Sequence, residues 1–408
     1  MTASRPVLTT PVLLLMAVAT GLCVGGNYFN QPLLDSIAEA LDTSRSAAAS
    51  TVTVAQVSYA LGLLFLVPLG DMFPQRRLAV MLMLFAAAGQ GASGFAPNIG
   101  VLVVGTAIAG LFSVAAQVLV PFAATLATPE HRGRAVGTVM SGLLVGILVA
   151  RSVAGILADL GDGWTTVYRV SAVAMVVVAL ALWRVLPATP PATRQGYGST
   201  LRSLGTLIVA HPRLRTRSLL GALSFASVSA LFSTMAFLLS DPPFGLGDLQ
   251  IGLVGLAGVA GAFAATAAGR LVDRGYGPPT TTAGVFTLIA SWAALAAGGV
   301  SLVWFVVGMV LVDLALNLVH ITNQNIVYAL DPDARSRVNS VYMTSYFVGA
   351  ASGSALGAAA WTVGGWSAVC VLGVGLAVLA CIVWALDRRL VAGMAVGSAT
   401  AAGGRATA

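Results

Sequence analysis

The chain has 408 residues, of which 58% are hydrophobic and only 9% are charged. Soluble domains carry about 25% charged residues, so a soluble core could not hide this much apolar surface behind so few charges. All 21 basic residues are arginine, which excludes a P-loop nucleotide site and lysine Schiff-base chemistry. The net charge of +7 does not indicate nucleic acid, because the arginines lie in short loops between apolar segments.

The apolar segments are long enough to cross a bilayer, which takes about 20 residues. We expect an all-α membrane protein, with the first segment serving as a membrane helix rather than a cleaved signal. Residues 188–216 form the longest polar stretch and are expected to be a cytoplasmic linker between bundles at 1–187 and 217–387, followed by a tail at 388–408. The twelve expected helices cover residues 10–33, 48–70, 78–96, 99–127, 135–158, 165–187, 217–240, 249–271, 280–300, 302–329, 337–362 and 366–386.

The arginines predict the orientation of the chain. With both termini in the cytoplasm, 18 of them fall on the cytoplasmic side, while Arg45 and Arg169 lie outside and Arg151 lies within a helix. This bias is the positive-inside pattern, and it predicts an even number of spans in the cell membrane.

An internal repeat relates the two halves. Six positions match at a spacing of 203, close to half the chain length, five with identical residues and one with two acids. Such repeats predict two six-helix bundles related by an axis along the membrane normal, with a solute site between them and alternating access by rocking. The pairs are Pro129 with Pro332, Glu130 with Asp333, Arg132 with Arg335, Arg134 with Arg337, Met140 with Met343, and Gly146 with Gly349.

Three motifs resemble those of the major facilitator superfamily, most of all the bacterial drug:proton antiporters and arabinose-efflux-like permeases. Residues 70–77 read GDMFPQRR and resemble the loop pattern G-x-x-x-D-R-x-G-R-R, with departures at Val67, Met72 and Pro74; residues 269–274 read GRLVDR and are a closer copy. Residues 27–34, NYFNQPLL, also resemble this efflux group. The antiporter motif G-x-x-x-G-P-x-x-G-G corresponds to Gly146, Ala150, Arg151, Ala154 and Gly155, with Arg151 in place of the proline.

Asp313 is the first candidate for chemistry. It lies about 16 Å from the outer end of its helix at 1.5 Å per residue, and it shares one face with Asn317, His320 and Gln324. Polar side chains on a membrane helix face the interior because lipid exposure is costly, and burial disfavours an ionised carboxylate. We expect Asp313 to carry protons, although a structural acid or a substrate contact are alternatives.

His320 and Arg151 are two further candidates. His320 corresponds in depth to Gln117 of the first half, and its ring either titrates during transport or packs through a hydrogen bond. Arg151 needs an acidic partner, carbonyl oxygens or water. It either pairs with an acid such as Asp313, binds an anionic solute, or extends outward.

The remaining expected site residues fall into two groups. A polar solute or a local network near Pro32 would use the side chains around residues 27–31, and we place in the substrate cavity Asn27, Tyr28, Asn30, Gln31, Gln56, Tyr59, Gln117, Arg151, Asn317 and Gln324. As the resemblance implies, a cytoplasmic gate would use Asp71, Arg76, Arg77, Arg134, Asp273 and Arg337, which otherwise only set topology. Gly142, Gly146, Ala150 and Ala154 form a small-residue ridge for helix packing.

The expected function is proton-coupled export of a small organic solute, with a facilitator or importer as the alternative. No enzyme activity or cofactor is expected. No metal site is expected either, since Cys23, Cys370 and Cys381 have no metal or disulfide spacing. A remote alternative is an intramembrane serine protease using Ser93 and His320. The expected partners are the solute, protons and the lipid bilayer, with the chain working as a monomer.

Overall fold

A computed structural model describes residues 8–128, 131–188, 197–258, 274, 276–331 and 335–406. The described elements are helical. Their bounds are α1 (Thr10–Gly25), η1 (Gln31–Leu33), α2 (Leu34–Ala40), α3 (Arg45–Phe65), η2 (Val67–Asp71), α4 (Gln75–Gly94), α5 (Ile99–Phe112), α6 (Ala115–Leu126), α7 (Arg132–Leu160), α8 (Trp164–Val185), α9 (Tyr197–Ala210), α10 (Pro212–Phe232), α11 (Met235–Ser240), α12 (Asp248–Val254), η4 (Gly255–Gly258), α14 (Gly277–Ala297), α15 (Leu302–Leu330) and α16 (Arg335–Ala406).

The twelve expected segments all contain helix. Within the described residues, seven helices are long and apolar enough to cross a membrane, or eight if the bent α7 counts as one span. The smaller number has four causes. Helix α1 has 16 residues, α4 (which begins with Gln75, Arg76 and Arg77) is not among the helices that qualify, the eighth segment is described only to Gly258, and α16 merges two expected helices. These two meet at Gly364 and Gly365, where a φ of 57° at Gly365 suits a residue without Cβ.

The outer surface of the bundle is apolar. On α8, for example, Val173, Val177 and Leu180 are 64%, 60% and 54% exposed, and their spacing places them on one face. Water would penalise this surface, whereas lipid would not. The structure is therefore that of a multi-pass membrane protein.

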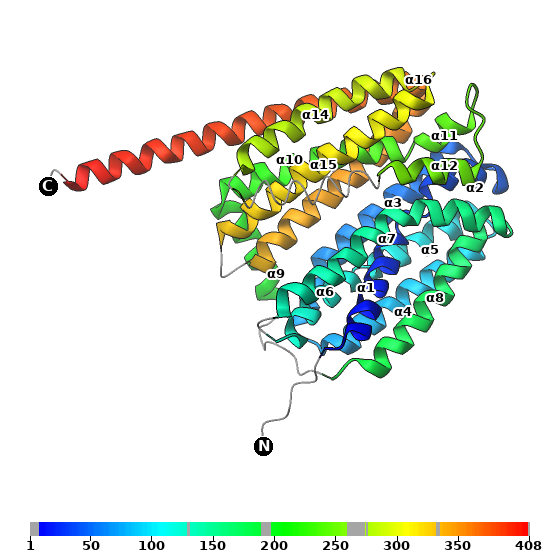
Figure 1. Cartoon of the computed structure of the whole chain (residues 1–408), viewed down its shortest axis with the longest axis horizontal. Helices are drawn as coiled ribbons and strands as arrows, with labels where there is room; N and C mark the ends of the chain where they lie inside the picture. Colours follow the sequence, from blue (N-terminus) through cyan, green and yellow to red (C-terminus); the bar gives the residue numbers. More distant parts are fainter. Residues whose placement is uncertain are drawn as a thin grey trace.

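The helices form two packed groups (Figure 1). In the first, α1 packs on α7 and α4 packs on α8; in the second, α10 packs on α16 and α14 packs on α15. The groups meet where α3 contacts α16 and where α7 contacts α12, and the short elements η1, α2, α11 and α12 gather at one end.

Close glycine contacts repeat between the two groups. A Cβ on Gly146 of α7 would overlap Gly21 of α1, and a Cβ on Gly349 of α16 would overlap Ala222 of α10. Gly146 and Gly349 are one of the repeat pairs, so the same helix crossing is built twice. The small-residue ridge packs as predicted, because Gly142 similarly meets Ala17.

Two features were not anticipated. Helix α9 lies inside the expected linker, where its Tyr197 hydroxyl donates to the Phe65 carbonyl oxygen at 2.8 Å. The backbone of α16 also continues as helix through the expected tail to Ala406. The division of the chain at 187, 217 and 387 remains a prediction.

Candidate functional site

Arg151 lies on α7, between the two groups of helices. Its side chain is 4% exposed, and its Nε donates to Gln31 Oε1 at 2.6 Å. Its guanidinium carbon lies 3.6 Å from the ring centre of Phe232 on α10 and 5.4 Å from that of Tyr28. The guanidinium therefore contacts both halves, and outward extension, one of the three expectations for Arg151, is wrong.

Asp313 lies in the middle of α15 and interacts electrostatically with Arg151. It is 9% exposed, and its Oδ2 is buried without a hydrogen-bond partner. Among the described residues, Arg151 and Asp313 do not approach within the 4.0 Å of an ion pair. The charge of Arg151 thus acts on the Asp313 carboxyl group without a direct contact between the two. A buried charge is costly unless it is neutralised or paired.

The rest of the polar stripe on α15 makes local contacts. Asn317 donates to the Asp313 carbonyl oxygen at 2.9 Å, and Gln324 approaches the Met343 sulfur at 3.8 Å. His320 Nδ1 lies 3.0 Å from the Tyr342 hydroxyl, and its ring is 4.5 Å from that of Tyr346. These contacts hold Asn317 and His320 in place against α15 and α16.

The polar residues of the first half form separate small contacts. Asn30 donates to Thr51 at 2.9 Å, and Gln117 donates to the Tyr59 hydroxyl at 3.3 Å. The amide of Gln56 is buried beside Tyr28 without a hydrogen bond of normal geometry. Asn27 is also buried. Tyr59 reaches the second half through a ring contact of 4.4 Å with Phe347. The bonds of the other described residues in this group are local, so the structure does not bring all the expected cavity residues together.

Polar contacts join the two halves at what we call the closed end, made by Asp35, Ser36, Arg45, Asp241 and Asp248. Arg45 contacts Asp241 at 2.6 and 2.7 Å and Asp35 at 2.8 Å, and the Ser36 hydroxyl lies 2.7 Å from both carboxylate oxygens of Asp248. Beside them lies an open groove of about 500 Å³.

Two close backbone contacts seal the same end. Ser152 donates to the Gly252 carbonyl oxygen at 2.9 Å, and a Cβ on Gly155 would lie 2.6 Å from the Asp248 carbonyl oxygen. Burial raises the pKa of Asp248, as do the nearby carboxylates of Asp35, Glu39 and Asp159, while the Ser36 hydroxyl lowers it. These acids were not singled out as site residues from the sequence.

The expected gate is described only in part. Asp273 and the side chain of Asp71 lie outside the described residues. Arg76 donates to the Leu186 carbonyl oxygen at 3.0 Å and stacks on Trp183 at 4.6 Å, both within the first half. Arg77 and Arg134 are exposed and Arg337 is half-buried, so a gate role for these arginines remains a prediction.

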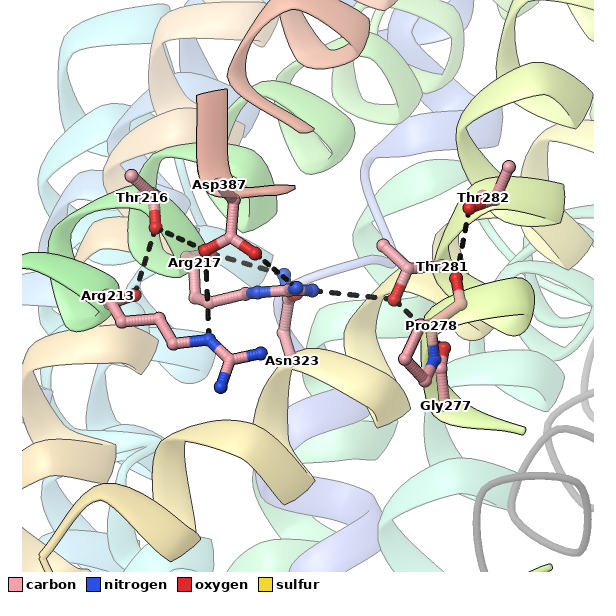
Figure 2. A network of polar contacts seen from close by, with 9 residues as sticks. All are labelled: Arg213, Thr216, Arg217, Gly277, Pro278, Thr281, Thr282, Asn323 and Asp387. Carbon is pink, nitrogen blue, oxygen red and sulfur yellow. Dashed lines mark hydrogen bonds and ion pairs between the residues drawn. The ribbon is translucent and has the colours of Figure 1, made fainter. Parts of the chain in front are cut away.

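A second buried cation was missed, because Arg217 was counted among the loop arginines. It is 4% exposed and pairs with the 1% exposed Asp387 at 2.5 Å (Figure 2). Arg217 also donates to Asn323 and Thr281, while Thr216 donates to Asp387 at 2.6 Å. The network ties α10, α14, α15 and α16 together. Its sequence signal was an arginine and an aspartate at the edges of two apolar segments.

Serine protease geometry is not formed around Ser93. Ser93 is buried on α4 and its hydroxyl has no hydrogen-bond partner among the described residues, while His320 contacts Tyr342 on α16.

Comparison with known proteins decides the family. The family model described as Major Facilitator Superfamily matches residues 16–333. The chain belongs to this superfamily. It is a membrane transporter with the major facilitator fold of two related six-helix bundles.

Similar proteins are also named as transporters. The chain is 50% identical to the "Uncharacterized transporter YgaY" of Escherichia coli O157:H7 over 94% of this chain and 97% of that one. It is 33% identical to the "Probable transporter SCO4007" of Streptomyces coelicolor, over 88% and 83% of the two chains. The fold matches that of a bacterial homologue of the human lysosomal transporter Spinster in an inward-facing, occupied conformation, with a TM-score of 0.73, 16% identity and coverage of 95% and 98%.

Proposed function

We propose that this transporter is a proton-coupled secondary transporter of a small organic solute in the cell membrane, with both termini in the cytoplasm. The observation that carries the proposal is the buried Asp313 carboxyl group on which the charge of the buried Arg151 acts. Nothing in the sequence can use ATP through a P-loop, because the chain has no lysine, so an ion gradient is the driving force.

The coupling follows from charge balance inside the protein. An ionised Asp313 is balanced by Arg151, which is always protonated. A proton on Asp313 removes that balance and leaves Arg151 as a lone buried cation, which favours rearrangement or binding of another group. Asp313 is therefore the group through which proton binding changes the preferred conformation.

Alternating access is supported by the placement of the contacts between the halves. The ion pair of Arg45 with Asp241 and the bond of Ser36 to Asp248 both lie at the closed end. We infer that in this conformation the solute enters from the opposite end. Opening requires these contacts to break while the other end closes.

The direction of transport has two candidates. Export is favoured because residues 27–34, and the antiporter-like motif between Gly146 and Gly155 on α7, resemble those of efflux permeases. Import is favoured by the pair of Arg151 and Asp313, because an anion that binds when Asp313 is protonated would travel with the proton. Accumulation in everted rather than right-side-out vesicles supports export, and the reverse supports import.

The proton coupling is tested in energised everted vesicles that contain a pH-sensitive dye. A panel of sugars, nucleosides, organic acids and amphipathic drugs is added, and proton movement is recorded. Wild-type protein should move protons with at least one compound, and Asp313→Asn should abolish this. Asp42→Asn is the control, because Asp42 is exposed and its positive φ of 44° suits asparagine. Unchanged coupling in Asp313→Asn would overturn the proposal.

A further inference from the structure

We propose that Arg151 is the binding group for the carboxylate of an organic monoanion with an aromatic or other apolar body, and that Asp313 competes with this carboxylate for Arg151. The inference rests on the proposed function, since it assigns the solute class of the same site. It concerns binding, and can be tested without a transport assay.

The first support is the unused hydrogen-bonding capacity of Arg151. A guanidinium has five N–H donors in a planar fork. Among the described residues, Arg151 makes one side-chain hydrogen bond, from Nε to Gln31. The Nη1 and Nη2 groups are left, and this pair of nitrogens is the part of arginine that binds a carboxylate through two parallel bonds.

The second support is the missing counter-charge. Arg151 is 4% exposed, and no described carboxylate lies within 4.0 Å of it. Buried charges in proteins are paired or hydrogen-bonded. Asp313 interacts with Arg151 electrostatically, but its Oδ2 is also without a partner. The charge of Arg151 therefore acts on Asp313, but no direct bond between the two side chains uses up the hydrogen-bonding groups of either.

The third support is the apolar surroundings of the guanidinium. Phe232 and Tyr28 lie against it, and Phe225 is two turns before Phe232 on the same face of α10. Phe225 in turn stacks on Tyr346 at 4.2 Å. Aromatic faces pack an apolar or aromatic body and cover the ion pair from water.

The expected charge of the solute follows from the one positive charge that Arg151 provides. Arg151 is the cation whose charge acts on Asp313. With Asp313 protonated, one monoanion gives a neutral site. A dianion such as a phosphate monoester would leave an uncompensated buried charge, which is strongly disfavoured.

The test is a binding measurement on purified full-length protein in detergent. The probes are a panel of monocarboxylates, including benzoate, 3-phenylpropionate and octanoate, each compared with its neutral amide. Binding is measured by isothermal titration and by the shift in melting temperature. The wild-type protein should bind at least one carboxylate and discriminate against its amide.

The variants give opposite expectations for the two residues. Asp313→Asn removes the internal competitor, so carboxylate affinity should rise by about tenfold or more. Arg151→Gln removes the binding group, so affinity should fall by roughly 10- to 100-fold, and Arg151→Lys should recover only part of the affinity because lysine lacks the fork. Arg215→Gln, which replaces an exposed arginine on α10, should change nothing.

A double variant controls for folding. Arg151→Gln with Asp313→Asn removes both buried charges at nearly constant volume, so it should fold and should bind acid and amide equally. The inference is overturned if no carboxylate of the panel binds, if Asp313→Asn weakens carboxylate binding, or if Arg151→Gln leaves the discrimination intact. The vesicle assay tests the proposed function separately. If one of these binding results is obtained while Asp313→Asn still abolishes proton movement in vesicles, this inference fails and the proposed function stands.

Discussion

Arg45 on α3 and Asp241 at the end of α11 form a two-pronged ion pair, with contacts of 2.6 and 2.7 Å, that joins the two halves of the transporter. The two side chains are 33% and 43% exposed. Partly exposed pairs contribute about 0.2–1 kcal/mol, and the conformational balance of a transporter responds to changes of this size.

Loss of this pair should open the closed end. We expect Arg45→Gln to raise the population of the open conformation by a few-fold, since 1 kcal/mol corresponds to about fivefold in an equilibrium. The measurement is the distance distribution between spin labels at Ala40 and Gln250, both exposed, in a background without native cysteines. An unchanged distribution would show that the pair does not hold the closed end together.

Asp248 predicts a pH dependence of the same equilibrium. Its pKa is raised in the closed end by burial and by neighbouring carboxylates, and it should return to about 3.9 when the halves separate into water. A proton therefore binds the closed form more tightly, so acidification favours closure and the effect is lost as the pH rises through the raised pKa. In an Asp313→Asn background, which removes the effect of protonating Asp313, the same spin-label distances should shift toward closure from pH 7 to pH 4. Adding Asp248→Asn should keep the end closed at both. A shift toward opening on acidification would contradict this assignment.

The buried pair of Arg217 and Asp387 should be needed for stability. Removing one partner leaves the other as a buried charge, at a cost of about 3–5 kcal/mol. We expect Arg217→Met to lower the melting temperature strongly, while Arg217→Met combined with Asp387→Leu should recover most of it. Arg215→Met replaces an exposed arginine on the same helix and should have little effect. If the single and double variants melt alike, the pair is not coupled.

The close crossing of α10 and α16 gives a prediction with a matched control. A methyl group at Gly349 would overlap the backbone of Ala222, so Gly349→Ala should destabilise the protein by about 1–3 kcal/mol. Gly375 lies in the part of α16 beyond the break at Gly364 and Gly365, with open space around it, so Gly375→Ala should be neutral or stabilising by about 0.5–1 kcal/mol. Thermal unfolding in detergent compares the two. Equal melting temperatures would contradict the proposed helix contact.

Much of the fold could be predicted from the sequence because lipid imposes a simple rule on helix length and polarity. The apolar segments give the helices, and the spacing between Gly146 and Gly349 marks the repeat that the glycine contacts display in both halves. Helix α9 could not be predicted in this way, because it lies in a polar stretch and is not set by the hydrophobic thickness of a bilayer.

The site could be predicted less well. Asp313 and Arg151 stand out because charges are rare in membrane helices. Arg217 and Asp387 were missed because charges at the edge of an apolar segment resemble the arginines that set topology. The pairing of residues across the closed end, such as Ser36 with Asp248, depends on tertiary packing. A single sequence carries no signal for it.

The most direct test of the central claim compares two kinds of transport by Asp313→Asn protein in liposomes, using any solute that the wild-type protein moves. Exchange of labelled for unlabelled solute needs only alternating access, whereas accumulation driven by an imposed pH gradient also needs proton coupling. We predict that Asp313→Asn retains exchange and loses gradient-driven accumulation. Gradient-driven accumulation at the wild-type level in this variant would contradict the account.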